Sequence, residues 1–329
     1  MEYAWRRGVA MVALGALLSG GAGAAERTTD WPVKPVRLIV PFAPGGATDI
    51  VARIMAQGLS EVLGQQFVVD NRAGASGNIA VEMAARALPD GYTILINNVS
   101  TGAINPIAFA ATLKFDPTRE LTGVALLASI PNLLVSGTGF PPNNMKELID
   151  YAKARPGQLN YSNPIGAYSH LDMLEFMARA GIQMVNVPSK GAGASFAPVI
   201  AGEIHFSFLN AATVMPQVKA GRMKAFVTTA QKRLPDLPDV PTMAEAGFPG
   251  TGSVNWNGFF VPAKTPRAII DKLAAATTRV LQRPQVQAAF AKAGVPLTPS
   301  ASPEEFQAFV RSELTRWARI IKENNVKFE

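Results

Sequence analysis

In the first hundred residues, continuous apolar runs alternate with segments whose apolar residues recur at helical spacing. Residues 36–42 (VRLIVPF) form a continuous apolar run bounded by prolines, which is typical of a strand buried on both faces. Residues 47–63 carry apolar positions at helical spacing, and similar patterns predict strands at 66–71 and 92–98 around a helix at 77–91. Strand, helix, strand, helix, strand with short connections predicts a parallel, doubly wound α/β sheet.

The same alternation returns in the middle of the chain. Residues 143–157 predict a helix that starts at Asn and stops at Pro-Gly, and residues 170–181 predict a second helix. Strands are expected at 158–163 and 182–188, next to these helices. A second α/β unit is therefore predicted after the first one.

Two long apolar segments, 121–137 and 253–263, are expected to cross between two lobes. The proline, glycine and serine content of the first segment favours an extended strand over a membrane helix. After the second crossing the chain should return to the first lobe. The predicted organisation is a signal peptide at 1–24, lobe 1 at 25–130, lobe 2 at 131–252, and a return to lobe 1 at 253–329.

The N-terminus has the features of a secretory signal peptide. Arg6 and Arg7 precede an apolar stretch over residues 8–18, and an A-x-A site follows at residues 22–24. A membrane anchor is the alternative, but about a dozen apolar residues fall short of the ~20 that a spanning helix needs. We expect cleavage after Ala24 and a mature chain in the periplasm.

Composition removes several kinds of chemistry. The 329 residues include no cysteine, so disulfides, thiolate metal sites and a cysteine nucleophile are excluded. Net charge is +7, but no basic run exceeds Lys232-Arg233, and nucleic acid is not an expected partner outside the cytoplasm. His170 and His205 stand in no metal-binding or catalytic motif, so we expect no metal, no cofactor and no enzyme.

Two short motifs carry the remaining chemistry. A G-x-S-x-A around Ser195 keeps an exported serine hydrolase open as an alternative. Gly45 and Gly46 lie between a strand and a helix, where main-chain N–H groups can hold an anion, phosphate and carboxylate fitting equally well. The alternative is that these glycines only turn the chain. With Gly46 as N-cap, Asp49 falls at the third helical position, and we expect its carboxylate to accept the Gly46 N–H.

An ordered set of motifs resembles the Bug family, the TctC-like extracytoplasmic receptors of tripartite tricarboxylate transporters. These motifs include VRLIVPFAPGGATDIVAR at 36–53, NRAGASGNIA at 71–80, PDGYTIL at 89–95, LPDVPTMAEAGFPG at 237–250 and WNGFFVPAKTP at 256–266. The resemblance implies a two-lobed periplasmic-binding-protein fold of type II (Venus flytrap), with a doubly wound sheet in each lobe. It also implies a small organic carboxylate held between the lobes for delivery to membrane transporter subunits.

The resemblance also implies which residues contact the ligand, and Asn210 is added as the end of an apolar run. The expected ligand-binding residues are Phe42, Ala43, Gly45, Gly46, Ala47, Thr48, Asp49, Ser100, Thr101, Asn163, Ala167, Tyr168, Ser169, His170, Ser189 and Asn210. The second-lobe motifs depart from the family pattern at Pro164, Ala167, Ser189 and Pro198. With Tyr168 adding an aromatic face, we expect ligands other than simple dicarboxylates, larger or aromatic ones.

Two further expectations concern helix capping and partners. Ser169 and Asp172 have S-x-x-D spacing, so Ser169 is expected to cap a helix that begins at His170. The resemblance implies a monomer that passes its ligand to a transporter. A ligand-dependent periplasmic sensor, which docks on a signalling protein instead, stays open as a further alternative.

Overall fold

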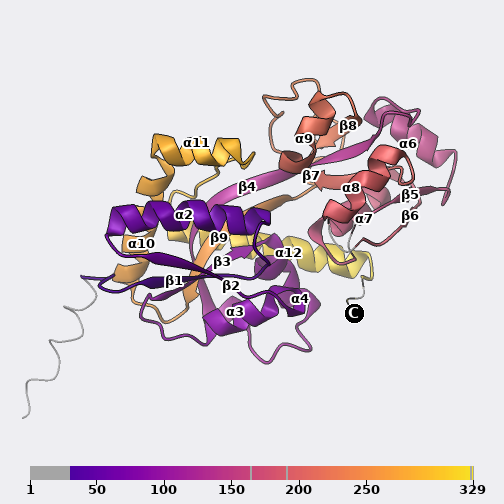
Figure 1. Cartoon of the computed structure of the whole chain (residues 1–329). Coiled ribbons are helices and arrows are strands. Elements are labelled where there is room, and N and C mark those ends of the chain that lie inside the picture. The colour runs from indigo at the N-terminus through magenta and orange to yellow at the C-terminus, as the bar shows by residue number, and fades with distance from the viewer. Residues whose placement is uncertain (1–29, 164, 190–191, 327, 329) are drawn as a thin grey trace, which may run out of the picture.

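The computed structural model describes residues 30–163, 165–189, 192–326 and 328, and shows two lobes joined by long strands (Figure 1). The predicted signal peptide and Pro164 lie outside the described residues. The crossing segments are strands β4 (Leu121–Gly137) and β9 (Val254–Pro262), which pair antiparallel with each other. The prediction that both segments are extended is confirmed. The exact lobe boundaries stay a prediction.

The sheet of the first lobe is mixed rather than parallel throughout. Strands β1 (Val36–Val40), β2 (Phe67–Asn71) and β3 (Thr93–Asn98) are parallel, as their apolar runs predict. The sheet order is β2-β1-β3-β9-β4, and β9 lies antiparallel to both of its neighbours. The two crossing strands cause this difference, because they run in opposite directions between the lobes.

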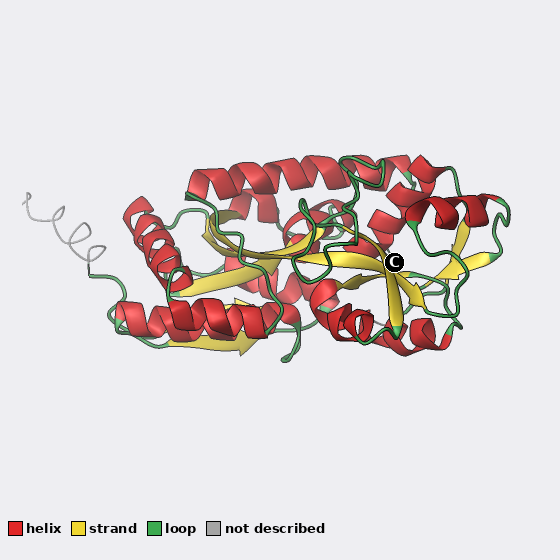
Figure 2. Ribbon diagram, turned by 90° about the horizontal axis from the view of Figure 1, so that it is seen from above, coloured by secondary structure: helices red, strands yellow, loops and turns green. Residues whose placement is uncertain are grey.

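Helices cover both faces of this sheet, as the view from above shows (Figure 2). One apolar core joins α2, α10 and α11 to one face, and a second core joins α3 and α12 to the other face. The helical segments of this lobe are α2 (Ala47–Leu63), η1 (Ala75–Gly77), α3 (Asn78–Ala85), the π-helix η2 (Ser100–Ile104), α4 (Asn105–Ala108), α5 (Pro117–Glu120), α10 (Arg267–Leu281), α11 (Pro284–Lys292) and α12 (Pro303–Glu323).

The second lobe is built on the far half of β4. Strands β7 (Ser207–Asn210) and β8 (Met223–Thr228) pair antiparallel with β4, while β5 (Leu159–Tyr161) and β6 (Met184–Asn186) form a parallel pair. The helices are α6 (Met145–Lys153), α7 (Tyr168–Ala180), α8 (Ala192–Ala201) and α9 (Ala211–Lys219). Together with the first lobe, this arrangement confirms the predicted two-lobed α/β fold.

Two helices of this chain, α6 and α12, use the capping box in a shifted form. Ser302 caps α12 and accepts the Glu305 N–H, as its spacing predicts. The Glu305 carboxylate, however, reaches back to the N–H of Ala301, one residue before the cap. In α6, the Glu147 carboxylate likewise accepts the N–H of Asn143, before the Asn144 cap. The same shift occurs at α2 and changes the picture of the candidate site.

Candidate functional site

The loop that follows β1 carries the predicted first-lobe contacts. Phe42 is half-buried, residues 43–46 are exposed, and α2 begins at Ala47 with Gly46 as its extended N-cap. Gly45 has φ +89°, which L side chains rarely adopt, although a Cβ there would meet nothing within 4 Å. The glycine at this position is therefore required by its backbone conformation. The first-turn N–H groups of Ala47 and Thr48 have no acceptor inside the helix.

Asp49 anchors this loop from inside. Its Oδ2 accepts the Gly45 N–H and the Arg53 Nε–H, both at 2.9 Å. Its Oδ1 accepts Asn71 Nδ2 at 2.9 Å, and the same Asn71 amide donates to the Phe42 carbonyl at 3.0 Å. The expectation that Asp49 binds the Gly46 N–H is wrong by one residue, because the carboxylate bonds the residue before the N-cap.

These contacts determine the charge of Asp49. Burial by itself raises the pKa of this carboxyl, but the hydrogen bonds from Arg53, Gly45 and Asn71 and the Arg53 charge outweigh it and lower the pKa. Asp49 is therefore ionised and paired with a cation. A carboxylate next to an anion-binding loop is compatible with that loop because Arg53 balances its charge.

Asn98, which sequence reasoning missed, joins the two predicted first-lobe segments. Its Oδ1 accepts the N–H groups of Ser100 at 3.0 Å and Thr101 at 3.2 Å. Its Nδ2 donates to Thr48 Oγ1 at 3.3 Å. The end of β3 thus connects η2 to the first turn of α2. The only feature of the sequence that indicates this role for Asn98 is its position directly after the apolar residues of β3.

Asn163 organises the second-lobe loop and is fully buried. Its Nδ2 lies 3.1 Å from Ser169 Oγ, 3.2 Å from Ser207 Oγ and 3.0 Å from the Phe208 carbonyl oxygen. Its Oδ1 has no partner among the described residues. The expectation that Ser169 caps a helix starting at His170 is wrong, because α7 starts at Tyr168 and Ala167 is the N-cap, without a side-chain cap. The Ser169 hydroxyl instead faces Asn163.

His170 is a structural acceptor. Its Nδ1 accepts the Gly166 N–H at 3.2 Å, and its ring stacks on Tyr161 with 6.2 Å between centroids. Burial lowers the pKa of His170, which favours the neutral ring that this hydrogen bond needs. The imidazole therefore holds the turn before α7 without adding positive charge.

Tyr168 and Asn210 both lie against the crossing strand β4. The Tyr168 hydroxyl donates to Asn132 Oδ1 at 3.3 Å, and its half-buried ring packs on the apolar core shared with α12. Asn210 pairs with Asn132 in the β4–β7 ladder, and its side chain caps α9 by accepting the Ala212 N–H at 3.1 Å. These two predicted residues thus lie where the lobes join.

Ser189 belongs to a short chain of hydroxyls. Ser195, which is fully buried, lies 2.9 Å from Ser189 Oγ and 3.1 Å from Ser162 Oγ. Nδ1 of His170 bonds Gly166 and Nδ1 of His205 bonds Asn160, and the hydrogen bonds of Ser195 go to Ser162 and Ser189 rather than to a histidine. A serine, histidine and carboxylate triad around Ser195 is therefore not formed, and the hydrolase alternative loses its structural basis.

The topology makes the two predicted sets face each other. β4 leads into the second lobe and β7 returns antiparallel to it, so the carboxyl ends of β1 and β3 point towards those of β5 and β7. Hydrogen bonds join each set internally, and within the described part of the chain none joins one set to the other. The lobe boundary is therefore the place where both loops could contact one ligand.

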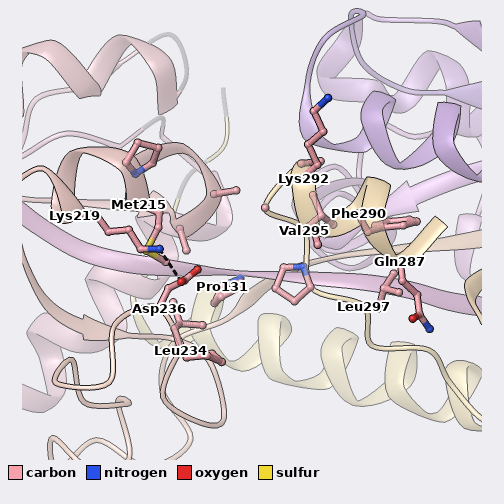
Figure 3. Close-up of a pocket in the computed structure, with 18 residues that line it drawn as sticks. Pro131, Met215, Lys219, Leu234, Asp236, Gln287, Phe290, Lys292, Val295 and Leu297 are labelled. Carbon is pink, nitrogen blue, oxygen red and sulfur yellow. Dashed lines mark hydrogen bonds and ion pairs between the residues drawn. The ribbon is translucent and has the colours of Figure 1, made fainter. Parts of the chain in front are cut away.

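A cavity of about 780 Å³ lies on another side of this boundary (Figure 3). Its walls are α9 and residues 234–236 in the second lobe, and α11 with residues 293–297 in the first lobe. Pro131 of β4 also lines it, and Lys219 and Asp236 form an exposed ion pair there at 2.6 Å. No predicted ligand-binding residue lines this cavity. It is an apolar groove beside β4, where residue 297 pairs with residue 128.

Two general features bear on the class of protein. Within residues 30–163, 165–189, 192–326 and 328, no helix is long and apolar enough to cross a membrane. In the same described part, no cluster of three or more His, Asp or Glu side chains is arranged to hold a metal ion.

Comparison with known proteins gives the family. The model of the TctC family, the tripartite tricarboxylate transporter family receptor, matches residues 51–326. Protein BugT of Bordetella pertussis is 31% identical over 315 residues, which cover 95% of this chain and 96% of BugT.

Two solved structures combine substantial identity with the same fold. Rpa4515 of R. palustris with adipate is 34% identical, with a TM-score of 0.78 over 90% of this chain and 99% of that one. MatC from Rhodopseudomonas palustris with bound malate is 32% identical, with a TM-score of 0.74 over 88% of this chain and 100% of that one. Structure, motif order and sequence identity agree, and the chain belongs to the TctC family of periplasmic solute-binding receptors, which are not enzymes.

Proposed function

We propose that this protein captures a small organic carboxylate between its two lobes in the periplasm and delivers it to the membrane subunits of a tripartite tricarboxylate transporter. The observation that carries the proposal is the N-terminus of α2, with its exposed Gly45–Gly46 loop after β1, a strand whose carboxyl end points towards the second lobe. Relatives with bound adipate and malate support a carboxylate as the ligand. The protein would reach this compartment after signal-peptide cleavage following Ala24.

Main-chain donors are the proposed carboxylate grip of the first lobe. The nearest cation, Arg53, is already bonded to Asp49 and Asn71, so it is not required to neutralise the ligand. The N–H groups of Ala47 and Thr48 and the positive end of the α2 dipole supply the attraction instead. Asp49 and Asn98 keep this loop in shape before the ligand arrives.

The second-lobe residues would close over the rest of the ligand. We infer that the loop around residues 163–170 and Ser189 sets which carboxylates fit, because this loop departs from the family pattern. Tyr168 adds an aromatic side chain beside Asn132 at the lobe boundary. Larger or aromatic acids are therefore proposed as ligands in preference to short dicarboxylates.

A thermal-shift screen of the mature protein tests this function. Adipate, malate and a set of aromatic monocarboxylates are each added well above the micromolar range. A ligand at 100 times its Kd adds about 2.7 kcal/mol to the free energy of unfolding, or roughly 5 °C to the melting temperature. If no carboxylate raises the melting temperature, the proposed function is wrong. If malate binds tightly and aromatic acids do not, the ligand preference is wrong.

A pair of glycine variants locates the site. Gly45→Val and Gly64→Val both place a β-branched residue at positive φ, at the start and at the C-cap of the same helix, and a Cβ meets nothing within 4 Å at either position. Both variants should lose stability through backbone strain. Only Gly45→Val should also lose the ligand-induced shift.

A further inference from the structure

Four charged side chains join helix α7 of the second lobe to helix α12. Arg316 Nη2 lies 3.3 Å from Asp172 Oδ1 and 3.1 Å from Glu175 Oε2. Arg319 Nη2 lies 3.3 Å from Glu175 Oε1. The Asp172 side chain is 0% exposed, Glu175 5% and Arg316 17%, so the central charges are withdrawn from water. We call Asp172, Glu175, Arg316 and Arg319 the α7–α12 ion cluster.

Asp172 also contacts the second crossing segment. Its Oδ2 accepts the Ser253 N–H at 3.0 Å and the Ser253 hydroxyl at 2.6 Å, directly before β9 begins. One carboxylate therefore joins α7, α12 and the start of a crossing strand. Figure 1 shows α12 at the level of the first-lobe strands, above α3 and α4, and extending to below α7. The ion cluster lies on the face of the lobe boundary that α12 covers.

The opposite face of the lobe boundary is built differently. There α9 and α11 are separated by the apolar groove of about 780 Å³, whose labelled side chains come from both walls (Figure 3). At this groove Ala212 of α9 packs against the first-lobe core, and a Cβ on Gly294 would lie 2.9 Å from Ala212 Cβ. One face of the boundary thus has buried ion pairs, and the other has an apolar groove. A rotation of the lobes would change the groove more than the ion cluster.

The ion cluster is close to the second-lobe ligand loop. Asp172 lies about one turn after the first residues of α7, which follow Ala167, its N-cap. Leu171, beside it, is buried in the same apolar core as Trp256 and Trp317. The position of the α7 N-terminus, and of Ser169 and His170 there, is therefore set by contacts with α12 and β9.

We propose that Arg316 is a positioning residue for ligand binding: through Asp172 and Glu175 it holds α7, and with it the second-lobe ligand loop, at a defined angle to the first lobe. The effect on ligand binding rests on the proposed function. The effect on the angle between the lobes does not depend on it. Removing the guanidinium widens the range of angles between the lobes and weakens ligand binding.

Protonation of Asp172 should loosen the same contact. Burial raises the pKa of Asp172 to about 6, against the lowering effect of Arg316 and Ser253. The other charged or titratable groups that face the cluster are Glu175, Arg319 with its partner Glu323, Glu313, which accepts the indole N–H groups of Trp256 and Trp317, and Tyr168. Protonation of Asp172 would remove one of the two carboxylate charges that contact Arg316.

The angle between the lobes can be measured without a ligand. The chain has no cysteine, so Gln57→Cys on α2 and Lys153→Cys on α6 place one spin label on each lobe at exposed positions. Distances between the labels are recorded at pH 7.5 and pH 5 in the otherwise native protein, Arg316→Gln, Arg316→Lys and Asp172→Asn. Arg311→Gln, the same charge change on an exposed residue of α12, is the matched control.

The expected result is a broader distance distribution in Arg316→Gln and Asp172→Asn than in the native protein or Arg311→Gln, with partial recovery in Arg316→Lys. The native protein at pH 5 should resemble Asp172→Asn at pH 7.5, and Asp172→Asn should not respond to pH. Adipate or malate, whichever binds the native protein, should bind Arg316→Gln roughly 2- to 30-fold more weakly.

Unchanged distances in a folded Arg316→Gln would overturn the proposal, as would an equal change in Arg311→Gln. If Arg316→Gln does not fold, the label distances in Arg316→Lys and Asp172→Asn test the proposal instead. Unchanged distances in both of these variants would overturn the proposal. If neither acid binds the native protein, the proposed function fails for these ligands, but the distances still test Arg316.

Discussion

Asp49 and Asp172 are both buried carboxylates near the start of a helix at the lobe boundary, and both contact an arginine. Asp49 bonds only to its own lobe, through Gly45, Arg53 and Asn71. Asp172 bonds to α12 and to the residue before β9, which lie outside the unit that contains α7. The first-lobe loop is therefore held by its own neighbours, and the second-lobe loop by contacts across the boundary.

The surroundings give these carboxyls opposite pKa shifts. Arg53, the partner of Asp49, has a side chain that is 55% exposed. The hydrogen bonds that Asp49 accepts outweigh the burial of its carboxyl and lower the pKa of Asp49. Burial dominates at Asp172 and raises its pKa to about 6, although Arg316 and Ser253 oppose it. The first-lobe loop is thus held by a carboxylate that stays ionised near neutral pH. The second-lobe loop is held by a carboxylate that is protonated at a higher pH.

The largest expected effect is on stability and comes from Arg316→Met. The change leaves Asp172 and Glu175 buried on α7 without the guanidinium that bridges them, which should cost about 3–5 kcal/mol. Urea unfolding at pH 7.5 measures the loss. Arg267→Met, which removes ion pairs with half-exposed partners, should cost far less. Equal losses in the two variants would show that burial of the cluster does not matter.

The pH dependence of stability should differ in sign between the two carboxyls. Because the pKa of Asp172 is about 6 in the folded chain and about 3.8 in a model peptide, the folded state binds more protons between pH 6 and 4. The contribution of Asp172 to stability therefore rises as pH falls through this window, by up to about 3 kcal/mol. The contribution of Asp49, whose pKa is lowered, is present above its unfolded pKa and is lost as pH falls below that value.

Urea unfolding between pH 3.5 and 7.5 separates these contributions. The native protein should gain stability relative to Asp172→Asn as pH falls from 7 to 4. It should lose stability relative to Asp49→Asn at the acid end of the range. A common direction for both differences would mean that the two carboxyls do not have opposite environments.

The sequence predicts the elements of both lobes better than their connections. Apolar runs identify β1, β3 and the crossing strands β4 and β9, because a strand buried on both faces is rich in apolar residues and has few charged ones. The S-x-x-D spacing of Ser169 and Asp172 indicated a local cap instead. The true partner of Asp172, Arg316, is 144 residues away, and only the folded arrangement of α12 brings it there.

The first-lobe site shows the same limit on a smaller scale. Glycines between a strand and a helix indicate the loop, and Gly46 as N-cap follows from helix periodicity. Which N–H the Asp49 carboxylate accepts depends on the φ of Gly45, since that backbone turns the Gly45 N–H towards it. The hydrogen bond from Asn98 to Thr48 depends on the alignment of β3 beside β1, which no short motif encodes.

Asp49→Ala should lower stability less than Arg316→Met does, although its effect on ligand binding should be large. The variant leaves the Gly45 N–H and the Asn71 amide without their acceptor, at a cost of about 1–3 kcal/mol, towards the lower end because the loop is open to water. The loop then loses its fixed shape, and affinity for the acid found in the thermal-shift screen should fall about tenfold. Arg53→Gln keeps the carboxylate and its bonds to Gly45 and Asn71 but removes the balancing charge, so affinity should fall less than in Asp49→Ala. A folded Asp49→Ala with native affinity would mean that the first-lobe loop does not depend on its carboxylate, and the contrast with Asp172 would no longer hold.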